Sequence, residues 1–184
     1  MIRKAAEADI PAVAGIYDKL HTEEEAGRAT IGWIRGVYPT EDTARQALSR
    51  DDLFVLEDSG SIVGAAIINQ TQVDAYSGGP WAFDAEDAEV MVLHTLVIDP
   101  DAAGHGFGKQ FVAFYEDYAR KNGCKVLRMD TNSRNARARA MYARLGYREA
   151  GIVSCVFNGI EGVGLVLLEK SVAPPLGELA RRQL

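Results

Sequence analysis

The stretch that begins at Val90 constrains the fold of this chain more than any other part of its sequence. Val90–Ile98 is a nearly continuous apolar run, which is typical of a central strand covered on both faces of its sheet. Alternating glycines follow and lead into a helix with one aromatic stripe, formed by Phe107, Phe111, Phe114, Tyr115 and Tyr118. A buried strand that passes directly into an amphipathic helix predicts an α/β domain.

The glycine loop between these two elements has the features of an anion site. Gly104, Gly106 and Gly108 let a ligand approach the backbone closely, and Lys109 adds a positive charge nearby. The first N–H groups of a helix lack intrahelical partners, and with the helix dipole they favour a phosphate or pyrophosphate. The alternative is a tight connection that needs glycine only for its backbone dihedral angles.

Two common nucleotide-binding motifs do not fit this loop. The dinucleotide motif G-x-G-x-x-G fails because the glycines here are spaced as G-x-G-x-G. The P-loop motif G-x-x-x-x-G-K-[ST] fails because Gln110 follows Gly108 and Lys109. The loop therefore favours neither of those two nucleotide folds.

The rest of the chain has the pattern of a single domain without repeats or linkers. Periodicity and turn residues predict strands at 2–5, 53–57, 62–70, 125–131, 152–157 and 163–169, and helices at 10–20, 41–50 and 135–145. Asn158-Gly159 supplies turn chemistry between the last two strands, and Gly146 closes the last helix. The expected order β-α-α-β-β-β-α-β-α-β-β describes an α/β (α+β) domain around one mixed sheet. We place that domain at residues 1–170 and an unassigned tail at 171–184.

Composition excludes several classes of protein. The formal net charge of −6 argues against a general nucleic-acid binder. Cys124 and Cys155 have no metal-ligand spacing and are too few for a disulfide framework, so we expect free buried thiols and no metal. The N-terminus lacks the apolar stretch of a signal peptide, and no run reaches the roughly 18 apolar residues of a membrane span. We expect a cytoplasmic protein that binds neither nucleic acid nor membrane.

Two segments of the sequence resemble motifs of the GCN5-related N-acetyltransferases (GNAT). Residues 104–109, GHGFGK, are similar to the pyrophosphate motif R/Q-x-x-G-x-G/A of that family. Residues 135–147, NARARAMYARLGY, resemble its N-x-x-A-x-x-x-Y-x-x-x-G-F/Y segment. The resemblance covers about residues 1–170 and implies the acyl-CoA N-acyltransferase fold. In that fold the sheet is mostly antiparallel, but two parallel strands splay apart, and helices flank it.

The resemblance implies acetyl-CoA as co-substrate, bound between the strands at 90–98 and 125–131. The backbone of Leu96, Val97 and Ile98 is expected to pair with the pantetheine arm, and the side chain of Asn135 to contact it. The pyrophosphate is expected on residues 104–109, namely Gly104, His105, Gly106, Phe107, Gly108 and Lys109. One departure from the motif is Ala103, which stands where the family usually has Arg or Gln. We therefore expect weaker or differently anchored binding, not its loss.

Two residues are the predicted catalytic groups. Tyr142 matches the family tyrosine that protonates the departing thiolate, although its place on an apolar stripe also fits a core aromatic. His94 interrupts the apolar strand, and His94-Thr95-Leu96-Val97-Ile98 is similar to a segment of arylalkylamine N-acetyltransferases whose histidine helps deprotonate the amine. A structural histidine is the alternative, and Glu89 is a second candidate base. Strict alternation places His94 on one face with Val90, Val92, Leu96 and Ile98 unless the strand carries a bulge.

The acceptor is expected to be the primary amine of a small molecule, attacking directly in a ternary complex. Trp33, Tyr38 and Trp81 are its candidate binding residues, with His21, Glu23 and Glu24 nearby in the sequence. Carboxylates beside aromatics suit a cation, although a solvated helix end and ordinary packing aromatics explain them equally. The alternatives are acetylation of a protein or peptide N-terminus and a non-catalytic acyl-CoA-binding module. The exposed edge of the last hairpin suggests a homodimer.

Overall fold

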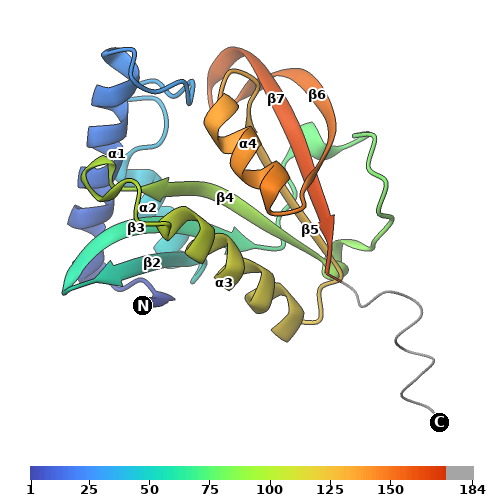
Figure 1. The fold of residues 1–184 in the computed structure, drawn as a ribbon, viewed down its shortest axis with the longest axis horizontal. Coiled ribbons are helices and arrows are strands. Elements are labelled where there is room, and N and C mark those ends of the chain that lie inside the picture. Colours follow the sequence, from blue (N-terminus) through green and yellow to red (C-terminus); the bar gives the residue numbers. More distant parts are fainter. Residues whose placement is uncertain (173–184) are drawn as a thin grey trace.

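The computed structural model describes residues 1–172, which form one seven-stranded mixed sheet in the order β1-β2-β3-β4-β5-β7-β6. Figure 1 shows the sheet with its helices packed on both sides. The strands are β1 (Ile2–Lys4), β2 (Leu53–Asp58), β3 (Ser61–Asn69), β4 (Val90–Ile98), β5 (Val126–Asn132), β6 (Arg148–Phe157) and β7 (Ile160–Ser171). The helices are α1 (Ile10–Glu25), α2 (Glu41–Ser49), α3 (Phe107–Lys121) and α4 (Ala136–Arg144), with short 3-10 turns at Glu7–Asp9, Asp74–Tyr76, Asp87–Glu89 and Pro100–Ala102. The predicted mixed, mostly antiparallel sheet with flanking helices is confirmed.

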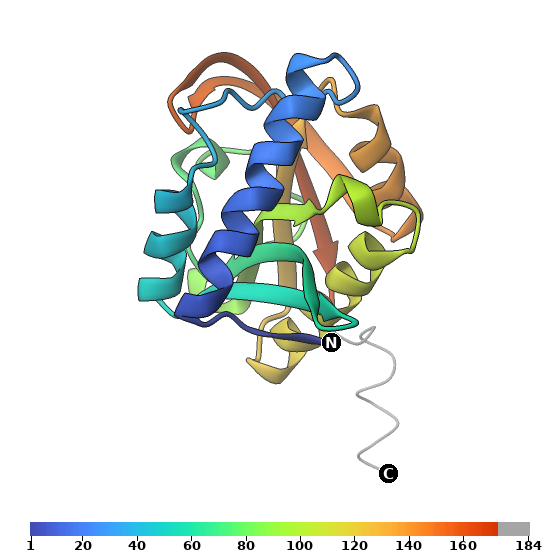
Figure 2. The same cartoon turned by 90° about the vertical axis from the view of Figure 1, so that its left-hand side faces the viewer.

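Three apolar clusters hold the helices and one loop segment against the two faces of the sheet. Figure 2 shows α1 and α2 apart from α3 and α4. One face carries α3 and α4, where Phe111, Tyr115 and Tyr142 pack on side chains of β2, β3, β4, β5 and β7. The other face carries α1 and α2 over β2 and β3. Beside them, the segment 73–85 packs on β4, β5 and β7. The segment 73–85, which lies outside every helix and strand predicted from the sequence, is thus a packed cover of the sheet.

The chemistry of the local sequence explains where the elements end. Pro11 stands in the first turn of α1, where its missing N–H costs no hydrogen bond. Asn158 and Gly159 both have positive φ, 52° and 77°, as a two-residue hairpin turn requires. Gly146 follows α4 with φ 84°, the left-handed conformation that closes a helix. The largest difference from expectation is α1, which continues through the acidic residues to Glu25 because helical hydrogen bonds persist there.

The two parallel strands separate halfway along their length. β4 pairs with β5 only from Val90 to Leu93, opposite Val126 to Met129. Beyond that point each strand keeps only its other partner, so that β4 pairs with β3 and Asp130–Asn132 pair with β7. The edge of Leu96, Val97 and Ile98 that faces β5 is therefore left without a strand partner. This is the splayed pair that the family resemblance implied.

A bulge in β4 corrects the expected alternation of its side chains. Thr95 has φ 49°, and the register with β3 shifts between His94 and Val97. Leu96 and Ile98 consequently pack on the α3 face, whereas Val97 packs on the α1 face. His94 shares its face with Val90 and Val92 but not with Leu96 and Ile98. A β-branched residue at positive φ is strained, so no sequence rule favours a bulge at this position.

The remaining predictions about the ends and surface of the domain have mixed outcomes. β7 runs to Ser171, one residue past the predicted end of the domain at residue 170. Most of the predicted tail lies outside the described residues. Both cysteines are free, but only Cys124 is buried. β6 is an edge strand with exposed Ile152 and Val156, and the homodimer stays a prediction. No helix within residues 1–172 has the length and apolar character needed to cross a membrane.

Candidate active site

A cavity of about 190 Å³ occupies the gap between the separated strands. It is lined from both faces of the sheet, so a ligand on the α4 side can meet a ligand on the α1 side. From the α4 side come Asn135, Ala138 and Tyr142, and from β4 and β5 come Leu93–Ile98 and Asp130–Asn132. The other side is closed by Leu20, Ile31, Gly32, Trp33, Tyr38, Val73, Phe157, Asn158, Ile160, Val163 and Leu165.

The glycine loop presents a row of unpaired backbone donors at one end of this gap. Within residues 1–172, no acceptor reaches the backbone N–H of any residue from Gly104 to Lys109, and Gln110 is the first to donate, to Gly106 O at 3.0 Å. Gly104 and Gly106 have φ of 88° and 80°, and a Cβ at either position would meet no atom within 4 Å. Successive free N–H groups at the start of a 15-residue helix favour a phosphate or pyrophosphate. These residues fit the predicted pyrophosphate of acetyl-CoA.

The other residues of this loop have distinct positions. Gly108 packs closely on α4, since a Cβ there would lie 3.4 Å from Met141 Sδ. His105 is exposed; its Nδ1 lies 3.2 Å from Ala102 O and its ring stacks on Phe107. Lys109 and Ala103 are exposed at the same end. The structure therefore leaves Lys109 free to approach an anion on the loop.

The residues predicted to hold the rest of acetyl-CoA line the gap. Leu96, Val97 and Ile98 present their free strand edge there. Asn135 also lines it, but its Oδ1 caps α4 by accepting from Ala138 N at 3.1 Å, which leaves its Nδ2 to donate. Among the arginines of α4, Arg139 is paired with Glu149 at 2.7 Å, whereas Arg137 is exposed.

Tyr142 reaches the gap from the α4 face. Its ring is 6% exposed and contacts Tyr147 edge-on, with ring centroids 5.9 Å apart. Burial raises the pKa of the Tyr142 hydroxyl, and the charge of Asp130 raises it further. The hydroxyl therefore keeps its proton at neutral pH and can serve as a proton donor. The packing role and the chemical role are compatible, because the ring is in the core while the residue lines the gap.

His94 faces the gap from the opposite side of the sheet. Its Nε2 lies 3.1 Å from both Asn69 Oδ1 and Thr71 O. Burial lowers the pKa of His94 to about 4, outweighing the hydrogen bond to Thr71 O and the charge of Asp52. The imidazole is therefore neutral at pH 7 and has one nitrogen with a free lone pair.

Asp130 is a site residue that the sequence did not reveal. It follows Met129 on β5, where β4 leaves, and it faces the same side of the sheet as His94. Its Oδ2 accepts a hydrogen bond from the buried Tyr76 hydroxyl at 2.7 Å. Burial raises the pKa of Asp130 to about 6, although the hydrogen bond from Tyr76 acts in the opposite direction. Asp130 is half-buried, and no Lys or Arg of residues 1–172 forms an ion pair with it, so its carboxylate is suited to pair with a ligand ammonium.

The predicted acceptor residues are only partly brought together. Trp33 and Tyr38 line the gap and contact each other edge-on at 6.0 Å, and the Tyr38 hydroxyl hydrogen-bonds Thr95 Oγ1. Trp81 does not line it. Its ring covers the Arg128 guanidinium at 4.3 Å, and its Nε1 donates to Tyr76 O, because it belongs to the packed cover of the sheet.

Other candidates have structural contacts instead. Glu89 pairs with Lys125 at the far end of β4, five residues or roughly 16 Å from His94, so it cannot act as the base. Glu24 accepts hydrogen bonds from Ile31 N and Gly32 N and thereby positions the wall of the gap. Glu23 pairs with Arg28 at 2.8 Å, and buried His21 bonds Pro39 O at 2.9 Å.

Comparisons with known proteins agree with this geometry. A model of the Acetyltransferase (GNAT) family matches residues 16–147. An uncharacterized N-acetyltransferase of Methanocaldococcus jannaschii is 29% identical over 103 residues, which make up 56% of this chain and 42% of that relative. The chain thus spans less than half the length of the curated relatives that it matches.

Solved structures show the same fold. The ribosomal-protein-alanine N-acetyltransferase of Brucella melitensis has a TM-score of 0.69 and 22% identity, covering 94% of this chain and 99% of that one. The protein yncA of Salmonella typhimurium, solved with its cofactor acetyl-CoA, has a TM-score of 0.65 and 20% identity, covering 96% and 98%. At such identities the likeness concerns the fold alone.

Proposed function

The chain belongs to the GNAT acetyltransferase family, and we propose that it transfers the acetyl group of acetyl-CoA to the primary amine of a small molecule. The two substrates would meet in a ternary complex inside the gap between β4 and β5. The observation that carries this proposal is the placement of Asp130 and His94 on one side of that gap and Tyr142 on the other.

The residues of the α4 side would hold the co-substrate. The N–H groups of 104–109 would bind the pyrophosphate, and the free edge of Leu96–Ile98 with Asn135 Nδ2 would bind the pantetheine arm. Ala103 contributes no side-chain donor, so the backbone amides provide most of the anchoring. When bound, acetyl-CoA supplies a thioester that an amine can attack.

The residues of the other side would prepare the amine. An alkylammonium has a pKa near 10 and carries no lone pair at neutral pH, so it must lose a proton before attack. The Asp130 carboxylate pairs with the ammonium and accepts that proton, and neutral His94 offers a second acceptor on the same face. Tyr142 delivers its hydroxyl proton to the sulfur from the α4 side. Overall the amine loses two protons: one replaces the proton that Tyr142 gives to the CoA thiol, and the other goes to solvent.

The lining of the acceptor side favours an amine with an apolar body. Trp33, Tyr38, Val73, Phe157 and Ile160 line the cavity together with Asp130, and no Lys or Arg side chain of residues 1–172 lines it. A substrate carboxylate would find no cation there, whereas an aromatic or alkyl amine would match both the walls and the charge. An amino acid with its free carboxylate fits less well.

A peptide N-terminus is the second candidate acceptor. One protein of the same fold is named as a ribosomal-protein-alanine N-acetyltransferase, and a peptide bears a primary amine without a nearby carboxylate. Such a substrate would need room to leave the site past Trp33 and the hairpin turn at Asn158-Gly159. A non-catalytic acyl-CoA-binding module is the third, and it gives no role to Asp130.

A thiol-release assay tests the proposal. Purified protein with acetyl-CoA is expected to release CoA thiol in the presence of arylalkyl and alkyl monoamines. Slower release is expected with amino acids and with short peptides. If kcat/KM is higher for peptides with an N-terminal alanine than for every monoamine, the acceptor is a peptide N-terminus instead. If the protein binds acetyl-CoA saturably but acetylates no amine, it is a non-catalytic acyl-CoA-binding module.

Gly106→Trp is expected to weaken acetyl-CoA binding at least 10-fold, because the side chain would fill the space over the free amides and Gly106 has positive φ. Calorimetric titration with acetyl-CoA measures the effect. Gly60→Trp is the matched control: Gly60 has φ 81° and open space around it, but it lies in the β2–β3 turn. Both variants carry the same backbone strain, so equal binding by the two would contradict the assignment of the loop.

A further inference from the structure

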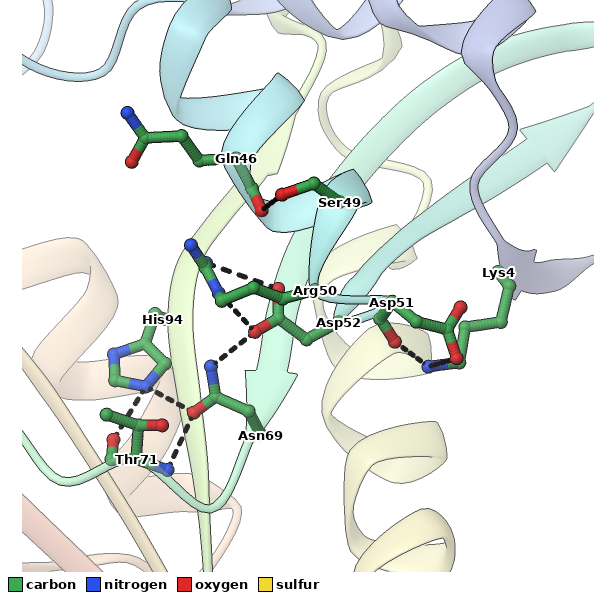
Figure 3. Close-up of polar contacts among 9 residues, drawn as sticks. All are labelled: Lys4, Gln46, Ser49, Arg50, Asp51, Asp52, Asn69, Thr71 and His94. Atoms are coloured by element: carbon green, nitrogen blue, oxygen red, sulfur yellow. Dashed lines mark hydrogen bonds and ion pairs between the residues drawn. The ribbon is translucent and has the colours of Figure 1, made fainter.

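A chain of polar contacts runs from the end of α2 to His94, on the side of the imidazole away from the gap. The Arg50 Nε donates to Asp52 Oδ2 at 2.9 Å, and Asn69 Nδ2 donates to the same oxygen at 2.8 Å. Asn69 Oδ1 then lies 3.1 Å from His94 Nε2, as Figure 3 shows. Asp52 is 6% exposed, so the carboxylate that Arg50 and Asn69 share is buried.

The chemistry of these groups fixes which atom donates at each step. A carboxylate only accepts, so the amide of Asn69 must turn its Nδ2 toward Asp52. The backbone N–H of Thr71 donates to Asn69 Oδ1 at 2.9 Å, which supports the same orientation. Asn69 Oδ1 and Thr71 O are both acceptors, so His94 must carry its proton on Nε2.

The free lone pair of His94 is consequently on Nδ1. Within residues 1–172 nothing hydrogen-bonds to that nitrogen, and Figure 3 shows it on the side of the ring away from Asn69. We propose that Asn69, oriented by Asp52, is a positioning residue that holds His94 in the Nε2–H tautomer with Nδ1 ready to accept a proton of the acceptor amine. This inference rests on the proposed function, because it assigns a task to His94 in that reaction.

His94 also separates two cavities. Besides the gap, it lines a second cavity of about 550 Å³ with Tyr38, Thr43, Arg50 and Asn69. Imidazole can exchange a proton at both nitrogens, so a proton taken on Nδ1 can be balanced by loss of the Nε2 proton to solvent through this second cavity, while Asn69 only orients the ring. The charged and titratable groups that share its surroundings are Asp42, Arg50 and Asp52 on the second-cavity side, Asp130 in the gap, and the hydroxyls of Tyr38 and Tyr142.

Nitrogen NMR of the free protein tests the tautomer without any reaction. The chain has three histidines, so the His94 ring is identified by its loss in His94→Ala. The wild-type spectrum is expected to show His94 as Nε2–H from pH 6 to 8. In Asn69→Ala only Thr71 O remains to fix the ring, so a mixture of tautomers is expected. Wild-type protein with His94 as Nδ1–H would overturn the proposal even if the enzyme is active.

Kinetics test whether the positioning acts through His94. Asn69→Ala and Asp52→Ala are expected to lower kcat about 10-fold with little change in KM for acetyl-CoA. The double variant His94→Ala/Asn69→Ala is expected to be no slower than His94→Ala alone, because the two changes remove one function. Additive losses in the double variant would contradict a role through His94.

A control variant and melting curves separate a loss of His94 positioning from a failure to fold. Ser49→Ala is the control, since that hydroxyl donates to Gln46 O near the same end of α2, and it should leave the tautomer and kcat unchanged. Melting curves identify variants that fail to fold. If no amine is acetylated, the proposed function fails, while the NMR result still decides the positioning of His94.

Discussion

Tyr142→Phe is expected to lower kcat for acetyl transfer about 10²-fold while leaving acetyl-CoA affinity nearly unchanged. The change removes one oxygen from a buried ring whose packing on α3 and the sheet is otherwise preserved. Burial holds the pKa of Tyr142 above its usual value, so the wild-type hydroxyl carries its proton across the neutral range. Its loss leaves the thiolate to depart without a proton donor. Steady-state kinetics with acetyl-CoA titrations measure both constants.

Tyr147→Phe is the matched control for this variant. Tyr147 is equally buried and contacts the Tyr142 ring, but its hydroxyl donates to Glu116 at 3.2 Å, away from the gap. It is expected to lose stability without a comparable loss in kcat. If the two variants lose kcat to the same extent, Tyr142 acts through packing and the proton donor is another group.

The fold was predictable because its signals are local. The glycine loop, the Asn158-Gly159 turn and the apolar run of Val90–Ile98 each determine their own conformation through short-range chemistry. The extension of α1 was missed because acidic residues at a helix end look like a solvated loop. There Glu24 instead holds the following backbone by accepting from Ile31 and Gly32.

The acceptor side of the site was less predictable, because segments far apart in the sequence create it. Arg128 and Asp130 alternate with Leu127 and Met129, a pattern that predicts a solvent-facing polar side. That side is covered instead, because Tyr76, Trp81 and Phe83 of the segment 73–85 pack over it. This cover leaves the Asp130 carboxylate half-buried and desolvated, and it also explains why Trp81 is structural. The bulge at Thr95 turns Leu96 and Ile98 away from the face of His94, and the residue types of this strand do not predict it.

Asp130→Asn is expected to lower kcat/KM for the amine about 10²-fold or more and to remove the acidic limb of its pH profile. Asp130 has a pKa of about 6 in the folded protein, so the wild-type activity should rise as pH increases through 6. Tyr76→Phe removes a hydrogen bond that lowers the pKa of Asp130, so its acidic limb should move to higher pH. An intact acidic limb in Asp130→Asn would assign the limb to another group.

The same variant is expected to be more stable than the wild type at pH 7. A carboxyl whose pKa is raised from 3.8 by folding stabilises the protein below that value, and this contribution is lost as pH rises through about 6. Asparagine mimics the protonated form and still accepts from Tyr76, so the free energy of unfolding should rise by about 1–3 kcal/mol at pH 7. At pH 4 the gain should largely vanish, whereas Asp58→Asn at the exposed end of β2 should change stability little at either pH. Asp130→Asn should therefore be more stable but less active than the wild type, as expected if Asp130 serves the reaction and not the packing of the fold. Equal stability of Asp130→Asn and wild type at both pH values would show that ionised Asp130 costs the fold nothing, and the raised pKa would then be wrong.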